Sequence, residues 1–145
     1  MPDRSIVVKR IETESELISC YAIRRLVFVD EQKVSPKDEY DGLDDQCLHY
    51  LLTMGGAAMA TARMRLLEGK AKVQRVAVLK PGRGQGLGLA LMRKMLDDAR
   101  AEGCAQAVLS SQVYAIPFYE RLGFVAHGPE YLDAGIPHRD MTLTF

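Results

Sequence analysis

The residues with the clearest chemical potential are Gly84, Gly86 and Gly88, which follow a Val-Ala-Val run at 76–78. They lie where a strand-like pattern gives way to a helical one. Glycine carries no side chain, so the backbone N–H groups at the start of the expected helix stay open to an approaching group. Free donors at the positive end of a helix bind anions. The spacing therefore predicts a pyrophosphate-binding turn over residues 83–88.

Two better-known phosphate loops do not match this turn. A dinucleotide fingerprint needs glycines at relative positions one, three and six. Counted from Gly82 or Gly84, the sixth position is Leu87 or Leu89. A Walker loop needs Gly-Lys after a glycine and four intervening residues, and no glycine of the turn has that pair. A nucleotide-binding module is therefore a weaker alternative.

The composition limits the class of protein. With 145 residues the chain suits one domain, over residues 1–145. Lys plus Arg and Asp plus Glu are both 19, so no basic excess indicates nucleic acid binding. The three cysteines and three histidines lack zinc-ligand spacing, and we expect no metal. No apolar signal core or membrane-length run is present, which predicts a cytoplasmic protein without membrane contact.

Periodicity predicts the elements that must position the turn. The first half should hold one helix and four strands, with Gly55-Gly56 as a hairpin turn and a long polar loop at 31–45. The ranges are 5–11, 47–54, 57–67 and 71–79 for the strands and 12–30 for the helix.

The second half should hold a helix from Leu87 to about Gly103, with apolar residues at 87, 91, 95 and 99 on one face. A buried strand at 107–109 follows, and because strand, helix and strand form a right-handed crossover, it should be parallel to 71–79. The remaining elements are a short helix at 114–122 and strands at 124–127 and 138–145. The order indicates a mixed α/β (α+β) sheet.

Four separated features resemble the GNAT N-acetyltransferase family. They are the strand at 76–78, the pattern Arg83-x-x-Gly86-x-Gly88, Gln112, and the segment Phe118-Tyr119-Glu120-Arg121-Leu122-Gly123-Phe124. Further segments at 27–32, 41–44, 49–51 and 135–138 resemble a small bacterial branch whose acceptors are largely unassigned. The resemblance implies the acyl-CoA N-acyltransferase fold, a central mixed sheet of about six to seven strands with a parallel, splayed fourth and fifth strand and flanking helices.

The resemblance also implies that acetyl-CoA is the acyl donor. Backbone groups of the 76–78 strand would then meet the pantetheine arm, and the amides of residues 83–88 would hold the pyrophosphate. Relatives commonly have Asn at the position of Gln112, which is one methylene longer. The implied contact residues are Val76, Ala77, Val78, Arg83, Gly84, Gln85, Gly86, Leu87, Gly88, Gln112, Phe118 and Tyr119.

By resemblance, the reaction is direct transfer of an acetyl group to a primary amine through a tetrahedral intermediate. Tyr119 is the expected general acid, because a phenol with a reference pKa of about 10 can donate a proton to the departing thiolate. The structural alternative is a buried tyrosine whose hydroxyl satisfies a backbone carbonyl. Its place in the Phe-Tyr-x-x-x-Gly-Phe segment favours the catalytic interpretation.

The sequence leaves the general base open. Residues 70–79 contain no carboxylate, although histone-acetylating relatives carry a glutamate on the equivalent strand. The candidates are Glu31, Glu130 and His138, acting directly or through water. Each also has a structural interpretation: a helix-end charge, a loop charge and a strand-edge packing residue, respectively.

Five carboxylates gather between Asp38 and Asp45. A solvated loop is the favoured interpretation of this cluster. If the cluster instead lies at the mouth of the site, it would attract a cationic amine.

The expected partners are a small-molecule amine acceptor and a second copy of the chain, since relatives often form homodimers. A non-catalytic acyl-CoA binding or sensor domain of the same fold is the alternative function. The absence of a carboxylate from the strand at 70–79 favours that alternative, whereas the presence of Tyr119 is evidence against it.

Overall fold

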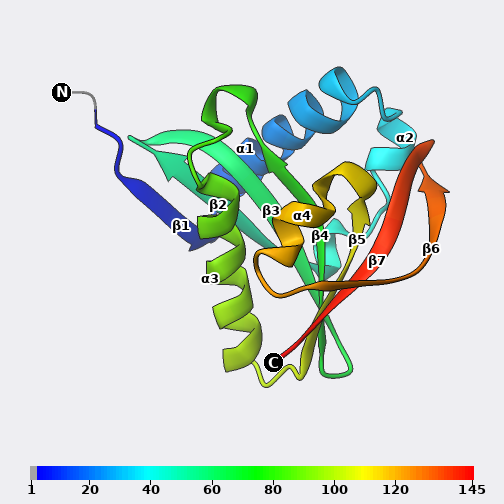
Figure 1. Ribbon diagram of the computed structural model, residues 1–145. Coiled ribbons are helices and arrows are strands. Elements are labelled where there is room, and N and C mark those ends of the chain that lie inside the picture. Colours follow the sequence, from blue (N-terminus) through cyan, green and yellow to red (C-terminus); the bar gives the residue numbers. More distant parts are fainter. Residues whose placement is uncertain (1–2) are drawn as a thin grey trace.

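The computed structural model describes residues 3–145, which form a seven-stranded mixed sheet in the order β1-β2-β3-β4-β5-β7-β6 (Figure 1). The predicted order of strands and main helices is confirmed, with further short helical turns between them. The elements are β1 (Ile6–Arg10), α1 (Glu14–Arg24), the π-helical η1 (Arg25–Glu31), α2 (Pro36–Glu39), η2 (Asp44–Gln46), β2 (Leu48–Met54), β3 (Ala57–Leu67), β4 (Lys70–Val78), η3 (Lys80–Gly82), α3 (Leu87–Ala101), β5 (Gln106–Gln112), η4 (Val113–Ala115), α4 (Ile116–Glu120), β6 (Val125–Asp133) and β7 (Ile136–Thr144).

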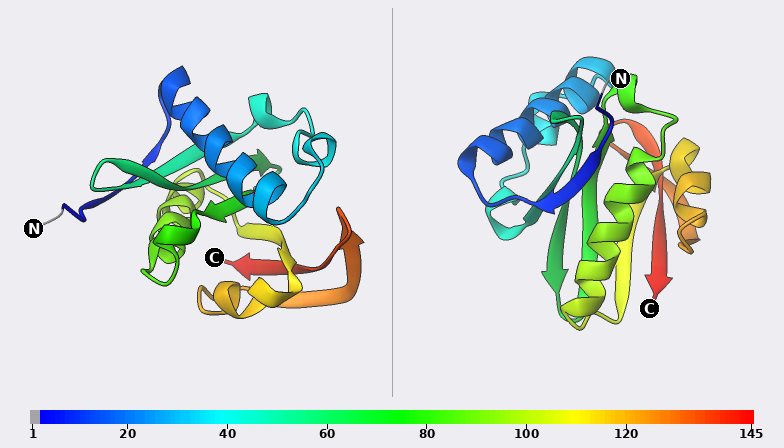
Figure 2. Two further views of the ribbon diagram at one scale, coloured as in Figure 1. Left: turned by 90° about the horizontal axis from the view of Figure 1, so that it is seen from above. Right: turned by 90° about the vertical axis from the view of Figure 1, so that its left-hand side faces the viewer.

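Helices cover both faces of the sheet. Figure 2 shows α1 on one face, and α3 and α4 on the other. The first helix begins at a capping box, in which Thr13 accepts from the amide of Glu16 and the Glu16 side chain accepts from the amide of Thr13. Its last part, η1, winds more loosely as a π-helix, so the helix predicted for residues 12–30 consists of two joined segments.

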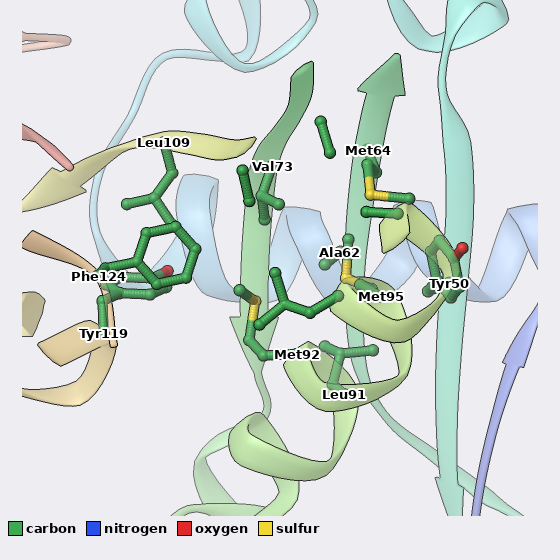
Figure 3. Packing of buried hydrophobic residues seen from close by; sticks show 14 of the residues in the cluster. Tyr50, Ala62, Met64, Val73, Leu91, Met92, Met95, Leu109, Tyr119 and Phe124 are labelled. Carbon is green, nitrogen blue, oxygen red and sulfur yellow. The ribbon is translucent and has the colours of Figure 1, made fainter. Parts of the chain in front are cut away.

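The main core lies between the sheet and α3 (Figure 3). The helical stripe predicted from residues 87, 91, 95 and 99 is confirmed, since all four side chains are buried. Met92 and Leu96 widen the stripe, and they belong to the same buried cluster as Tyr50, Met64 and Val73 of the sheet. A smaller cluster beneath α1 joins that helix to the opposite face. Burial of these two apolar surfaces fixes the helices on the sheet.

Three predicted boundaries are wrong, and the first is the strand predicted at 107–109, which is β5 and runs from Gln106 to Gln112. The polar loop expected at 31–45 contains α2, which Ser35 caps by accepting from the amide of Asp38 and which Pro36 begins. The strand expected to end at residue 127 continues to Asp133, because β6 and β7 form a long hairpin across a bulge between His127 and Tyr131. A Gly-Pro pair at 128–129 in the bulge explains why the sequence suggested an end.

The sheet opens between its two parallel strands. Pairing between β4 and β5 covers only Lys70–Lys72 with Gln106–Val108, whereas β5 pairs with β7 along its full length. Beyond Lys72, a bulge in β4 places Arg75 at a φ of 58° and shifts the register with β3. Because a bulge bends its strand and increases local twist, β4 leaves β5 at this point. The predicted parallel, splayed pair is confirmed.

No helix among residues 3–145 is long and apolar enough to cross a membrane.

Candidate active site

The opening between β4 and β5 forms a cavity of about 180 Å³. Residues 72–76 of β4 and part of β5 between Leu109 and Gln112 form two of its walls, and Tyr119 of α4 also lines it. The remaining walls come from residues within 34–39 and within 133–138. Phe28 of η1 and Ala115 of η4 complete the lining, so the cavity is bounded by segments from both halves of the chain.

The glycine turn lies at the N-terminus of α3, beside this cavity but outside its lining. Gly84 and Gly86 have φ values of 77° and 76°, and a Cβ atom on either would meet nothing within 4 Å. The first α-helical hydrogen bond runs from the amide of Ala90 to the carbonyl of Gly86, so the amides before Ala90 have no intrahelical acceptor. Open space and free donors at a positive helix end fit the pyrophosphate of a coenzyme A ester.

Gly88 serves a different purpose from the other two glycines. A Cβ atom there would lie 3.0 Å from Cζ of Phe118. The Phe118 ring in turn contacts the Tyr119 ring edge-on, with centroids 4.9 Å apart. The absence of a side chain at Gly88 therefore lets α4 pack against the start of α3, which sets the position of Tyr119.

Successive residues of β4 direct their backbone N–H and C=O groups toward opposite edges of the strand. The amide of Leu79 donates to Met59 of β3 at 2.9 Å, and because alternate residues of an antiparallel strand face alternate edges, Val78 faces away from β3. Its carbonyl accepts from Nε of Arg83 at 3.0 Å. Ala77 packs beneath α1, while Val76 lines the cavity. The open edge of β4 thus lies along the path between the glycine turn and the cavity.

Glu31 lies beside the glycine turn and not in the cavity. Its carboxylate accepts two hydrogen bonds from Arg83, at 2.6 and 2.7 Å, and both side chains are about 40% exposed. These bonds lower the pKa of Glu31. The carboxylate is therefore held in its charged form by a cation, which makes it a weak proton acceptor.

Tyr119 is 9% exposed and lines the cavity. Among the hydrogen bonds of residues 3–145, none involves its phenol, which differs from the structural alternative of a hydroxyl satisfied by a backbone carbonyl. Burial raises the pKa of Tyr119, so the phenol keeps its proton at neutral pH. The geometry suits a group that donates a proton into the cavity.

His138 is the one of the three candidate bases that lines the cavity. Its Nδ1 lies 2.7 Å from the carbonyl oxygen of Ile136, and because a carbonyl only accepts, Nδ1 carries the hydrogen. The neutral ring therefore has its free lone pair on Nε2. The imidazole also stacks on Tyr131, with centroids 6.2 Å apart. Glu130 is exposed on β6 and is absent from the cavity lining.

Gln112 lies at the end of β5, on the cavity wall. Its Nε2 donates to Oε1 of Gln32 at 2.8 Å, which ties β5 to the residue that follows η1. The partnership with Gln32 was not apparent from the sequence, because the two residues are 80 positions apart.

The prediction of a solvated acidic loop is wrong for the carboxylates that pair with arginines. Asp44 is 6% exposed, and its Oδ1 accepts from Arg24 at 2.7 Å and from Arg63 at 2.8 Å. Both arginines are almost fully buried and need a counter-charge. Burial opposes the charged form of Asp44, but the two arginines outweigh it and lower its pKa.

Two more carboxylates of this segment are paired with arginines. Asp41 binds Arg63, and Glu39 binds Arg24 at 2.7 Å and Arg75 at 3.3 Å. The negative charge expected at the cavity mouth is thus largely neutralised. No spacing in the sequence distinguishes these buried arginines from ordinary surface cations.

A mixed sheet that opens between two parallel strands, with a glycine turn at the following helix, defines the acyl-CoA N-acyltransferase fold. The sequence profile described as an acetyltransferase (GNAT) domain matches residues 27–145. The chain belongs to the GNAT acetyltransferase family.

Individual proteins agree with this assignment. The uncharacterized N-acetyltransferase YjcF of Bacillus subtilis is 37% identical over 132 residues, which cover 90% of this chain and 94% of that protein. An acyl-CoA N-acyltransferase from Pseudomonas aeruginosa superposes with a TM-score of 0.82 at 33% identity, covering 96% of this chain and 98% of the other. Escherichia coli ElaA gives the same TM-score at 26% identity and the same coverage.

Proposed function

We propose that the protein transfers the acetyl group of acetyl-CoA to a primary amine. Family membership supports acyl transfer, and the name of the Bacillus subtilis relative supports transfer to nitrogen. The observation that carries the proposal is the shared cavity of Tyr119 and His138, a proton donor and a proton acceptor, beside a turn that fits a pyrophosphate.

The acyl donor binds at the open amides of residues 84–89, and its pantetheine arm follows the unpaired edge of β4 toward the cavity. Holding the thioester and the amine together removes most of the entropic cost of their encounter. In this arrangement Arg83 exchanges part of its contact with Glu31 for the phosphates, since that pair is exposed and contributes only about 0–1 kcal/mol.

The amine nitrogen attacks the thioester carbonyl and forms a tetrahedral intermediate. Nε2 of His138 accepts the proton that the nitrogen loses, and a backbone N–H on the unpaired edge of β4 stabilises the oxyanion. When the intermediate collapses, the C–S bond breaks and Tyr119 protonates the thiolate of coenzyme A. The products are the acetylated amine and free coenzyme A.

Calorimetry with acetyl-CoA, followed by thiol release across a panel of amines, tests the proposal. We expect saturable binding and amine-dependent thiol release. Gly86→Glu should abolish binding, because it adds a negative charge where the pyrophosphate lies. Gly69→Glu is the matched control, since Gly69 also has a left-handed φ of 80° and open space around it but lies in the β3–β4 turn. Equal donor affinity of the Gly86 and Gly69 variants would contradict the proposed donor site.

A non-catalytic acyl-CoA sensor is the second candidate. Its support is β4, whose sequence from Lys70 to Val78 contains no carboxylate that could act as a base. Donor binding without thiol release from any amine of the panel would favour this function over acetyl transfer.

A further inference from the structure

Arg75 adopts a backbone conformation that arginine rarely takes. Its φ of 58° lies in the left-handed region, at the bulge where β4 leaves β5. For a non-glycine residue this conformation is strained, because Cβ approaches the following carbonyl oxygen. Surrounding contacts must therefore hold it, and residues in such conformations often lie at functional sites.

The guanidinium of Arg75 binds the segment that carries α2. Its Nε donates to the Glu39 carboxylate at 3.3 Å, and its Nη2 donates to the Glu39 backbone carbonyl at 3.0 Å. The same Nη2 lies 3.4 Å from the carbonyl of Asp38 and from Oδ2 of Asp41. Arg75 thus contacts both the main chain and the side chains of residues 38–41.

The other side of this segment is held by buried arginines. Arg24 of α1 binds Glu39 and Asp44, and Arg63 of β3 binds Asp41 and Asp44. Three arginines and three carboxylates, joined by hydrogen bonds, form one charge-balanced group that we call the arginine network: Arg24, Arg63, Arg75, Glu39, Asp41 and Asp44.

Packing alone does not fix the segment that the network holds. None of the four residues of α2 is buried, so little apolar surface attaches it to the sheet. Asp38 and Glu39 nevertheless line the cavity, in a wall that also includes Val34. The position of this wall must therefore depend on its ion pairs and hydrogen bonds.

This wall lies on the acceptor side of the cavity if the proposed function holds. The donor's pyrophosphate turn is formed by residues 83–88, none of which lines the cavity. An acetyl group reaching Tyr119 from that turn leaves the opposite walls, residues 34–39 and 133–138, for the amine.

We infer that Arg75 is a positioning residue that fixes the acceptor wall of the cavity. Its guanidinium joins residues 38–41 to the bulge of β4, so the wall and the strand edge that faces the thioester keep one relative position. This inference rests on the proposed acetyl transfer and adds to it a residue that acts on the amine through its contacts with residues 38–41.

Steady-state kinetics of Arg75→Gln, Arg75→Gly and Arg75→Lys test the inference, with the best amine of the panel as acceptor. For Gln and Gly we expect kcat/KM for the amine to fall by about tenfold, which equals 1.4 kcal/mol and lies within the range measured for coupled contacts. The calorimetric Kd for acetyl-CoA should change less than about twofold, because the Arg75 side chain binds residues 38–41 while the donor would contact β4 through its backbone. Lys keeps the charge and should recover part of the loss. Arg65→Gln is the control, because Arg65 lies on neighbouring β3 outside the cavity lining and the network.

The Gly variant separates the two roles of Arg75. Glycine adopts the left-handed conformation without cost but lacks the guanidinium. If Arg75→Gly retained wild-type efficiency toward the amine, the ion pairs would be irrelevant and the inference would fail. A parallel loss of acetyl-CoA affinity in all variants would also overturn it, because that result indicates general loss of structure.

Hydrogen exchange provides a test that does not need turnover. Arg75→Gln should increase amide exchange within residues 36–46 and leave α3 unchanged. Unchanged exchange in that segment would overturn the inference even if the protein acetylated every amine tested. If the wild-type protein released no thiol, but exchange in residues 36–46 still differed between Arg75→Gln and wild type, only the proposed function would be refuted.

Discussion

Tyr119 and His138 have complementary proton chemistry within one small cavity. Burial keeps the phenol protonated, and the hydrogen bond to Ile136 leaves Nε2 of the imidazole free to accept. Tyr119 lies on α4, and His138 lies on β7, the antiparallel neighbour of β5. Their roles can be separated by single substitutions.

Tyr119→Phe should lower kcat by about 10²-fold or more, the usual contribution of a positioned general acid. The ring stays in contact with Phe118 and Phe124, so stability and the Kd for acetyl-CoA should change little. A thiol-release assay measures kcat, and calorimetry measures the Kd for acetyl-CoA. Tyr40→Phe is the control, because Tyr40 is 71% exposed and outside the cavity lining. Equal kcat values for the two variants would exclude Tyr119 as the acid.

His138→Ala should remove the acidic limb of the pH profile of kcat/KM, because the limb reports protonation of the base in the free enzyme. Glu130→Gln should keep the wild-type profile, since Glu130 is exposed and outside the cavity lining. Glu31→Gln should change acetyl-CoA affinity through Arg83 and leave the shape of the profile intact. A limb that survives in the His138 variant but disappears in either glutamate variant would reassign the base.

The contact between α3 and α4 fixes the position of Tyr119. The apolar stripe of α3 packs on the sheet, and its first turn, at Gly88, receives the Phe118 ring of α4. This contact links the glycine turn to the cavity, so a change in helix packing should alter both the glycine turn and the position of Tyr119.

Gly88→Val should destabilise the protein by about 1–3 kcal/mol, the usual effect of overpacking. The new Cβ would lie 3.0 Å from Cζ of Phe118, so the Phe118 ring, which also packs on Tyr119, would have to shift. Denaturant unfolding measures the change. Arg93→Val on the exposed face of α3 controls for helix propensity and should cost only about 0.5 kcal/mol. Equal losses for the two variants would show that Phe118 moves aside freely.

The arginine network connects distant parts of the molecule, because its ion pairs join α1, residues 36–46, β3 and β4. Arg63 holds the pKa of Asp41 well below its ordinary value, and the pKa of Asp44 is lowered as well. Carboxylates with lowered folded-state pKa values stabilise the fold above their unfolded-state value, about 3.9 for Asp, and lose that contribution as the pH falls toward the folded-state value.

The free energy of unfolding should therefore be nearly constant above about pH 5 and should fall below about pH 4. Asp44→Asn should lower it by about 3–5 kcal/mol at neutral pH, because it leaves Arg24 and Arg63 buried with less counter-charge. The variant's acid dependence should also be shallower. Asp97→Asn, which removes an exposed pair with Arg100, should cost less than about 0.5 kcal/mol. Urea titrations at several pH values measure both variants, and parallel pH curves would contradict the assigned role of Asp44.

The features that the sequence determined are those with a local cause. The stripe on α3, the Gly55-Gly56 hairpin, the glycine turn and the parallel crossover follow from periodicity, glycine conformation and chain handedness, which act over a few neighbouring residues or one connection. The same patterns, with the Phe118–Phe124 segment, indicated the family that the sequence profile confirms.

The tertiary structure alone decided which charges and proton acceptors meet. Glu31 and Arg83 are 52 positions apart, and Asp41 and Arg63 are 22 apart, so no local pattern pairs them. The sequence offered Glu31, Glu130 and His138 equally as bases, but the β6–β7 hairpin places only His138 in the cavity. Side-chain periodicity shows which face a residue occupies, whereas its partners depend on how distant elements pack, and packing is fixed only when the whole chain folds.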